Sequence, residues 1–240
     1  MLVEVCANSL ESALNAEKAG ADRIELCTEL GVGGITPSHG LITEVKKRLK
    51  IPIHVLIRPR SGDFSYSNWD FEVMKNDIAF CKSLGVDGIV AGVLHSDFSV
   101  DVERMETLVD AAESMKFTFH RAFDWISNPL HSIKQIEELG IDYVLTSGKE
   151  NSAEKGLELL MNLNEVSKTV TVMAGGGIKH DNCIKFKKAG LTALHLSGVV
   201  LEQSMNLGNK ISMNSSEHLK EDRIAVTNKE MVRQIIHSVK

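Results

Sequence analysis

The chain has 240 residues with a formal net charge of −5, and 43% of its residues are hydrophobic. This length suits one large α/β domain, and the slight acidic excess gives no support for nucleic-acid binding. No apolar run approaches the roughly 20 residues of a membrane helix, and the start of the chain lacks the pattern of a signal peptide. We therefore expect a cytoplasmic protein with no nucleic-acid or membrane partner, whose four cysteines are thiols.

A short motif recurs along the chain: a glycine, a brief spacer and an apolar strand. Copies lie at residues 20–24, 85–89 and 140–144, each with an Asp in the spacer, and a weaker copy lies at 190–194. Each interval between the glycines holds about two βα units of roughly 30 residues. The glycine is typical of a helix C-cap, and the Asp is typical of the turn that follows.

Between these copies, further strands are predicted at 2–6, 53–58, 117–121 and 170–174. Apolar stripes at helical spacing lie between successive strands, the first from a Ser9 N-cap to Gly20. A last helix is predicted over 227–240, capped by Thr227 or Asn228. This alternation predicts an α/β fold, a single (β/α)8 TIM barrel over 1–240 with its core strands within 1–198. A doubly wound sheet is the alternative, but its strands would be apolar on both faces.

Polar and apolar residues alternate in the strands, and the polar residues are mostly ionisable. Because side chains alternate between faces, one face of each strand packs on helices and the other lines the barrel interior. The ionisable or thiol residues on the inner face or just past the strand ends are Glu4, Cys6, Glu25, Cys27, His54, Arg58, Arg60, His120, Arg121, Asp124 and His195. Barrel enzymes build their sites where strands end, so function is expected there.

Two long segments interrupt the βα rhythm, residues 59–69 and residues 199–226. Each follows a strand, so each is predicted to be a loop at the C-terminal mouth, with 199–226 lying over it. Long ordered loops in compact domains are more often functional than short ones. A tolerated insertion is the alternative.

Seven segments together resemble the copper homeostasis protein CutC family. They are residues 4–7, 20–27, 33–38, 54–64, 119–124, 145–148 and 173–178. The resemblance runs from the start to about residue 198. It implies a cytoplasmic TIM barrel that takes part in copper homeostasis and binds Cu(I).

Cys6 and Cys27 are the predicted metal ligands, since both lie on the inner face of neighbouring strands. Strands lie about 4.8 Å apart, so two thiolates at one height could hold a soft Cu(I) ion. Met205 and Met213 would add thioethers if the late loop folds over the mouth. The alternative is that both cysteines are small buried apolar residues, as we expect for Cys81 and Cys183.

An enzyme of the lyase or isomerase kind, acting on a small anionic carbonyl or sugar-like compound, is the alternative function. Glu25 would be the acid or base and His120 its counterpart, with Asp124 nearby, while Arg58 and Arg60 would hold a carboxylate or phosphate. No organic cofactor is expected. The structural alternative is ion pairing inside the barrel, for example Glu4 with His54.

Glycines follow the last two barrel strands, where many barrels bind phosphate through backbone N–H groups. The predicted anion-binding residues are Gly175, Gly176, Gly177, Ser197 and Gly198. A tight turn is the alternative for so short a motif. We expect a copper ion or a small anionic molecule as ligand, and a homo-oligomer, either a dimer or a tetramer.

Overall fold

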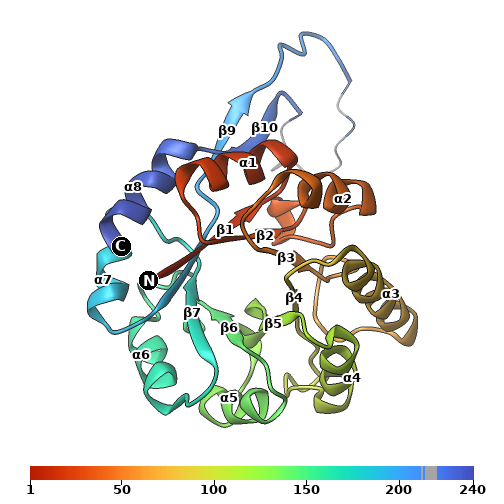
Figure 1. Cartoon of the computed structure of the whole chain (residues 1–240), viewed down its shortest axis with the longest axis vertical. Helices are drawn as coiled ribbons and strands as arrows, with labels where there is room; N and C mark the ends of the chain where they lie inside the picture. Colours follow the sequence, from red (N-terminus) through yellow and green to blue (C-terminus); the bar gives the residue numbers. More distant parts are fainter. Residues whose placement is uncertain (212, 214–220) are drawn as a thin grey trace.

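Eight parallel strands close into a barrel in chain order, surrounded by helices (Figure 1). The structure, a computed structural model, describes residues 1–211, 213 and 221–240. The barrel strands are β1 (Leu2–Ala7), β2 (Arg23–Leu26), β3 (Ile53–Leu56), β4 (Gly88–Ala91), β5 (Lys116–Phe119), β6 (Tyr143–Thr146), β7 (Thr171–Gly175) and β8 (Ala193–Leu196). The predicted single (β/α)8 barrel is confirmed.

The α-helices follow the strands along the chain. They are α1 (Leu10–Ala19), α2 (His39–Arg48), α3 (Asn68–Leu84), α4 (Val102–Ala112), α5 (Pro129–Glu138), α6 (Leu157–Val166), α7 (Cys183–Lys188) and α8 (Lys229–Val239). Two short 3-10 turns, η1 (Leu30–Val32) and η2 (Arg121–Trp125), follow β2 and β5 at the mouth. Asn228 caps α8 through its side chain.

The repeated motif has a structural reason at the N-terminal end of the barrel. Gly20 and Gly85 end α1 and α3 in the left-handed conformation, which glycine adopts without steric cost. The motif's Asp then accepts the backbone N–H near the start of the preceding strand. Three such bonds are present: Asp22 from Val3 (2.8 Å), Asp87 from Ile53 (3.0 Å) and Asp142 from Phe117 (2.8 Å).

The strand alternation has the predicted consequence for packing. Val3, Val5 and Ile24 are fully buried in the apolar layer between barrel and helices. In the register of β1 and β2, Glu4 pairs with Arg23 and Cys6 with Glu25. Ionisable side chains therefore stack in layers inside the barrel, and the register decides which of them meet.

The segment 199–226, predicted to be a loop, begins and ends as strands instead. β9 (Val199–Gln203) pairs antiparallel with β10 (Arg223–Thr227), and Figure 1 shows this ribbon projecting beyond α1. Asn8 and Asn15 donate from their side chains to the carbonyls of Ala225 and Thr227, which fixes β10 beside α1. Residues 212 and 214–220, also inside the predicted loop, lie outside the described residues.

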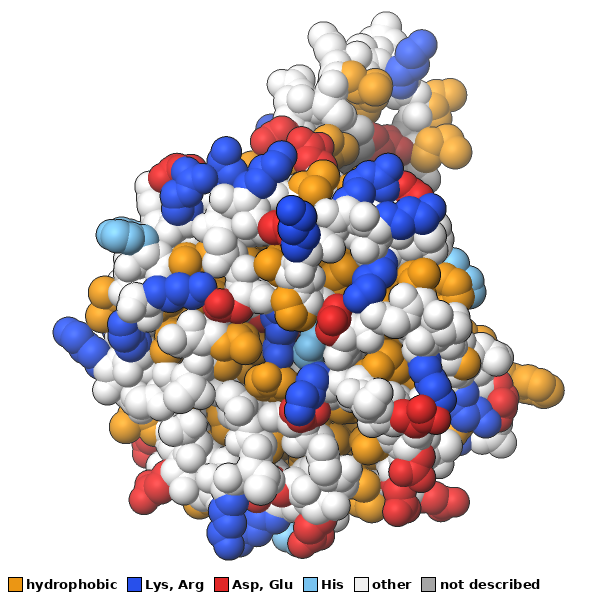
Figure 2. Space-filling view, in the orientation of Figure 1, with side chains coloured by type: hydrophobic (Ala, Val, Ile, Leu, Met, Phe, Trp, Pro, Cys, Tyr) orange, Lys and Arg blue, Asp and Glu red, His pale blue; other side chains and the backbone are white. Residues whose placement is uncertain are grey.

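Neither of the predicted thioether ligands lines the cavity at the mouth. Met205 is 61% exposed and Met213 is 90% exposed, so neither adds a ligand at the mouth. On the face seen in Figure 2, basic and acidic side chains are mixed over the barrel, and hydrophobic side chains lie between them and on the ribbon. Within the described part of the chain, no helix has both the length and the apolar character needed to cross a bilayer.

Candidate functional site at the barrel mouth

A cavity of about 970 Å³ opens at the C-terminal ends of the barrel strands. The polar and charged side chains that line it are Glu25, Arg58, Ser61, Asp63, His120, Arg121, Asp124, Lys179, His195 and Ser197, together with the Cys6 thiol. Apolar side chains such as Leu30, Leu145 and Ile178 complete the wall. A large apolar cavity with a few convergent polar groups is the usual form of a small-molecule site.

Two carboxylates share one imidazole at the base of this cavity. His195 Nδ1 lies 2.8 Å from Glu4 Oε1 and 3.8 Å from Glu25 Oε2. Arg23 Nε donates to the other oxygen of Glu4 at 2.5 Å, and its guanidinium stacks 3.9 Å from the ring centre of Tyr143. The expected pairing of Glu4 with His54 is therefore wrong. Glu4 instead forms ion pairs with Arg23 and with His195. His195 lies beside Glu4 because β8 pairs with β1 where the barrel closes.

The surroundings of Glu4 and Glu25 shift the pKa values of the two carboxyl groups in opposite directions. Burial alone would raise the pKa of Glu4, but Arg23 and His195 outweigh it and lower the pKa to about 2. Burial raises the pKa of Glu25 to about 7, and the charge of Glu4 adds to the effect against the attraction of His195. Burial disfavours the charged form of His195, yet Glu25 and Glu4 raise its pKa well above the usual value. Glu25 is thus the group of the cluster that gains or loses a proton near neutrality.

His120 lies on another part of the wall and is not the partner of Glu25. Its Nδ1 accepts the backbone N–H of Ala122 at 3.2 Å, so Nε2 carries the proton of the neutral ring. Burial, helped by the positive charge of Arg58, lowers the pKa of His120 to about 3. Three buried polar atoms around the cavity have no hydrogen-bond partner among the described residues: Glu25 Oε2, Arg58 Nε and His120 Nε2. Such atoms are suited to meet a ligand.

The two arginines predicted to hold an anion, Arg58 and Arg60, mainly bind groups of the protein itself. Arg58 Nη1 donates to the carbonyls of Val32 and Gly34, and Nη2 donates to Gly62. Its fork therefore ties the loop after β2 to the loop after β3, and both N–H groups of Nη1 are used. Nε and one N–H of Nη2 are left for a ligand. Arg60 does not line the cavity; it pairs with Asp63 and Asp70 within its own loop and the start of α3.

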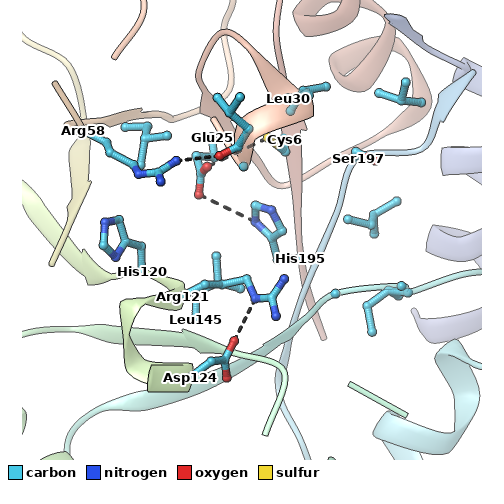
Figure 3. A pocket seen from close by; sticks show the side chains of 18 of the residues that line it. Cys6, Glu25, Leu30, Arg58, His120, Arg121, Asp124, Leu145, His195 and Ser197 are labelled. Carbon is cyan, nitrogen blue, oxygen red and sulfur yellow. Dashed lines mark hydrogen bonds and ion pairs between the residues drawn. The ribbon is translucent and has the colours of Figure 1, made fainter. Parts of the chain in front are cut away.

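Arg121 is the arginine whose guanidinium is best placed to bind an anion in the cavity. Its Nε donates to Asp124 at 2.8 Å and its Nη2 to Ser147 Oγ at 2.8 Å, so the guanidinium is held at the cavity wall. Asp124 also accepts from the hydroxyl of Thr146 and the backbone of Ser147. Figure 3 shows His195 between Glu25 and the Arg121–Asp124 pair. Asp124 thus positions Arg121 at the cavity wall.

Four of the five predicted anion-binding residues line the cavity, and one of them lies beside Arg121. Gly176, Gly177, Ser197 and Gly198 line the cavity, and a Cβ on Gly176 would come within 3.6 Å of the Arg121 guanidinium. Gly175 does not line it. A Cβ there would lie 2.4 Å from Leu145, so this glycine serves close packing inside the barrel.

The predicted thiol pair is in contact. Cys6 Sγ lies 3.3 Å from Cys27 Sγ and 3.9 Å from Glu25 Oε1. The hydrogen bond to Cys27 and burial both raise the pKa of the Cys6 thiol well above its usual value. Leu30, Leu56 and Val90 surround the two sulfurs. Cys81 and Cys183 are buried in the helical layer, as expected.

Sequence reasoning missed Arg23 and Ser147 and gave Arg121 no role. Arg23 carried a usable signal, because it stands two residues before Glu25 and therefore faces the barrel interior. Ser147 follows β6 directly, at the level of the mouth. No pattern in the sequence shows that it meets Arg121, which comes from the turn after β5.

A family model described as the CutC family matches residues 1–200 of this chain. A family protein CutC of Proteus mirabilis (strain HI4320) is 45% identical over 195 residues, which cover 81% of this chain and 78% of that protein. A solved structure from Streptococcus agalactiae, named as a copper homeostasis protein CutC, is 33% identical with a TM-score of 0.78, covering 82% of this chain and 98% of that one. A thiamine phosphate pyrophosphorylase from Pyrococcus furiosus, 16% identical with a TM-score of 0.62 and coverage of 99% and 95%, shares the fold alone.

Proposed function

This chain belongs to the CutC family, and from that premise we propose that its barrel mouth performs proton-transfer chemistry on a small anionic organic molecule. The observation that carries the proposal is Glu25, a carboxyl group at the cavity wall whose pKa is raised to about 7. A general acid or base works best when its pKa lies near the working pH. The reaction class would be that of a lyase or an isomerase.

In this proposal Glu25 takes a proton from a carbon or hydroxyl group of the ligand and returns it. Glu4 is already ionised by Arg23 and His195, so it supplies the negative charge that keeps Glu25 weakly acidic. His195, positively charged beside Glu25, would stabilise the carboxylate in its ionised form. His120 would donate a neutral hydrogen bond from Nε2 to a ligand oxygen, since burial keeps the ring uncharged.

The anionic group of the ligand would bind at the other wall. There the Arg121 guanidinium lies beside Gly176, with Gly177, Ser197 and Gly198 also lining the cavity. The Nε and Nη2 groups of Arg121 are used by Asp124 and Ser147, and among the described residues Nη1 has no protein partner. A charge-assisted hydrogen bond from a fixed arginine favours a carboxylate or phosphate.

Hydrogen exchange tests the proposal without knowledge of the natural reaction. The protein would be incubated in D₂O with pools of small phosphorylated or carboxylated carbonyl compounds, and loss of C–H signals would be followed by proton NMR. We expect exchange into at least one compound by the wild type and a loss of at least about 100-fold in Glu25→Gln, the scale of general acid–base catalysis. Arg60→Ala, altered outside the cavity, is the matched control. Equal exchange by Glu25→Gln and wild type would contradict the proposal.

A second candidate function, Cu(I) binding for copper homeostasis, is favoured by the 3.3 Å contact between the Cys6 and Cys27 sulfurs. Two free thiols in an apolar surrounding suit a soft monovalent metal. An ion held between both sulfurs would require the pair to open beyond its 3.3 Å contact. Glu25 is the third group within reach, but a carboxylate suits harder metals.

An anaerobic Cu(I) titration against a competing chelator tests this second candidate. The comparison is between wild type, the Cys6→Ser/Cys27→Ser double variant and Cys81→Ser, whose thiol is buried in α3 away from the pair. Binding of one ion that only the double variant loses would support copper binding. It should strengthen as the pH rises, because Cys6 must release its proton. Binding that the double variant retains would contradict it.

A further inference from the structure

Three aromatic side chains form a rim on one side of the mouth. The ring centres of Phe64 and Trp125 lie 4.9 Å apart and those of Phe98 and Trp125 lie 6.2 Å apart, both pairs edge to face. Phe64 also contacts His120, at 4.9 Å between ring centres. A second cavity of about 380 Å³ lies against this aromatic rim and shares Asp63, Phe64 and Trp125 with the main cavity. The rim therefore continues the main site outward.

Phe98 has a conformation that stability alone does not explain. Its φ is +65°, a left-handed value that is unfavourable for a bulky side chain, and 47% of the residue is exposed. The turn is closed by the backbone, with Phe98 donating to the carbonyl of His95 and His95 donating to that of Ser99. Glycine or asparagine would fit this position with less strain. Strain at an exposed aromatic residue beside a cavity points to a role in binding.

Trp125 connects this rim to the candidate anion site. It stands four residues after Arg121 in η2, and at about 2.0 Å per residue of a 3-10 turn the backbones of the two residues lie roughly 8 Å apart along the turn axis. Trp125 is 47% exposed and lines both cavities, while Arg121 lines the main one. One short turn thus places a guanidinium in the main cavity and an indole where the two cavities meet.

We propose that the rim of Phe64, Phe98 and Trp125 binds a planar aromatic ring of the ligand, whose phosphate or carboxylate is held at Arg121. Edge-to-face aromatic contacts favour such a ring over an aliphatic chain of the same size. The inference rests on the proposed function for the anion site, and it narrows the substrate class from small anions to aromatic or other planar-ring anions. Asp63 and His95, which also line the second cavity, would bound the ring at its polar edge.

Tryptophan fluorescence tests the proposal directly. The chain has two tryptophans, and Trp69, which is 83% exposed, lines neither cavity. In Trp69→Phe, Trp125 is the single reporter, and it would be titrated with phenyl phosphate and with inorganic phosphate. We expect saturable quenching with at least about tenfold tighter binding of phenyl phosphate, the scale of one good aromatic contact. Equal affinities for the two probes, or no saturable change with either, would overturn the proposal.

Phe98→Ala and Phe98→Gly in the same background separate binding from a structural role. We expect both to bring phenyl phosphate to within about threefold of inorganic phosphate, leaving the phosphate affinity unchanged, on the same scale of one lost aromatic contact. Phe98→Gly should also raise the thermal midpoint, because the left-handed strain is removed. A fall in both affinities together with a lower midpoint would overturn the proposal in favour of a structural residue.

Failure of this inference and failure of the proposed function are distinguishable. If no compound exchanges hydrogen in a manner that depends on Glu25, but phenyl phosphate still binds more tightly than inorganic phosphate, only the proton-transfer proposal fails. If exchange depends on Glu25 but the protein binds phenyl phosphate no more tightly than inorganic phosphate, only the proposal of an aromatic subsite fails.

Discussion

Replacing Glu25 by glutamine should make the protein more stable at neutral pH, although it removes the group proposed to act on the ligand. The carboxyl is buried beside the ionised Glu4, and its pKa is raised from 4.5 to about 7. Between these two values the unfolded chain releases the proton of Glu25 while the folded chain retains it. Stability contributed by this group is therefore complete below pH 4.5 and is lost as the pH rises through 7.

The size of the effect follows from the shift in pKa. At roughly 1.4 kcal/mol for each pH unit, the interval from 4.5 to about 7 corresponds to about 3 kcal/mol. Urea denaturation of wild type and Glu25→Gln at several pH values from 4.5 to 8 measures it. The wild type should lose about 3 kcal/mol more than the variant across this range, so that the variant is the more stable protein at pH 8.

The matched control is Glu11→Gln, which removes a carboxylate from the exposed side of α1. Its stability should follow the same pH dependence as the wild type. Parallel curves for wild type and Glu25→Gln would refute the reasoning, because Glu25 would then have the same acidity in the folded and unfolded chain. A variant less stable at pH 8 than the wild type would refute it as well.

Arg23→Gln should cost about 3–5 kcal/mol in urea denaturation at pH 7, because the buried carboxylate of Glu4 loses one of its two cationic partners and keeps only His195; a cost below 1 kcal/mol would contradict this pairing. Arg60→Ala should leave phenyl phosphate affinity unchanged in fluorescence titrations, since Arg60 pairs with Asp63 in its own loop and Asp70 at the start of α3. A large loss of affinity would show that Arg60 contributes to binding after all. Gly176→Ala and Gly190→Ala, both at positive φ, should each cost about 1–2 kcal/mol of stability. Only the change at 176, beside the cavity, should also weaken phosphate binding, so equal affinities for the two variants would contradict an anion site there.

The fold was predictable because it depends on periodicities that are local in the sequence. The glycine–Asp motif marks where helices end and strands begin, and its Asp side chains hold the strands together. The period of two within each strand sorted Glu4 and Glu25 to the interior and Val3 and Val5 to the helical layer. The two strands β9 and β10 were missed because they pair antiparallel with each other outside the barrel, where the βα alternation makes no prediction.

The partners within the site were less predictable, because they depend on strand register and loop conformation. His195 meets Glu4 only because β8 closes on β1, 191 residues apart in the sequence. Arg58 was correctly placed at the mouth, but the carbonyls that occupy its fork come from loops whose paths no pattern specifies. The expected cytoplasmic location and homo-oligomeric state stay predictions.

The acidity of Glu25 can be measured on the protein itself. Carbon-13 NMR of the side-chain carboxyl carbons, with Glu25→Gln to assign the resonance, would follow its titration between pH 3 and 9. A pKa near 7 is expected, because burial and the charge of Glu4 oppose ionisation. A pKa near the ordinary value of 4.5 would contradict it, since Glu25 would then be ionised throughout the neutral range and unsuited to exchange a proton with a ligand.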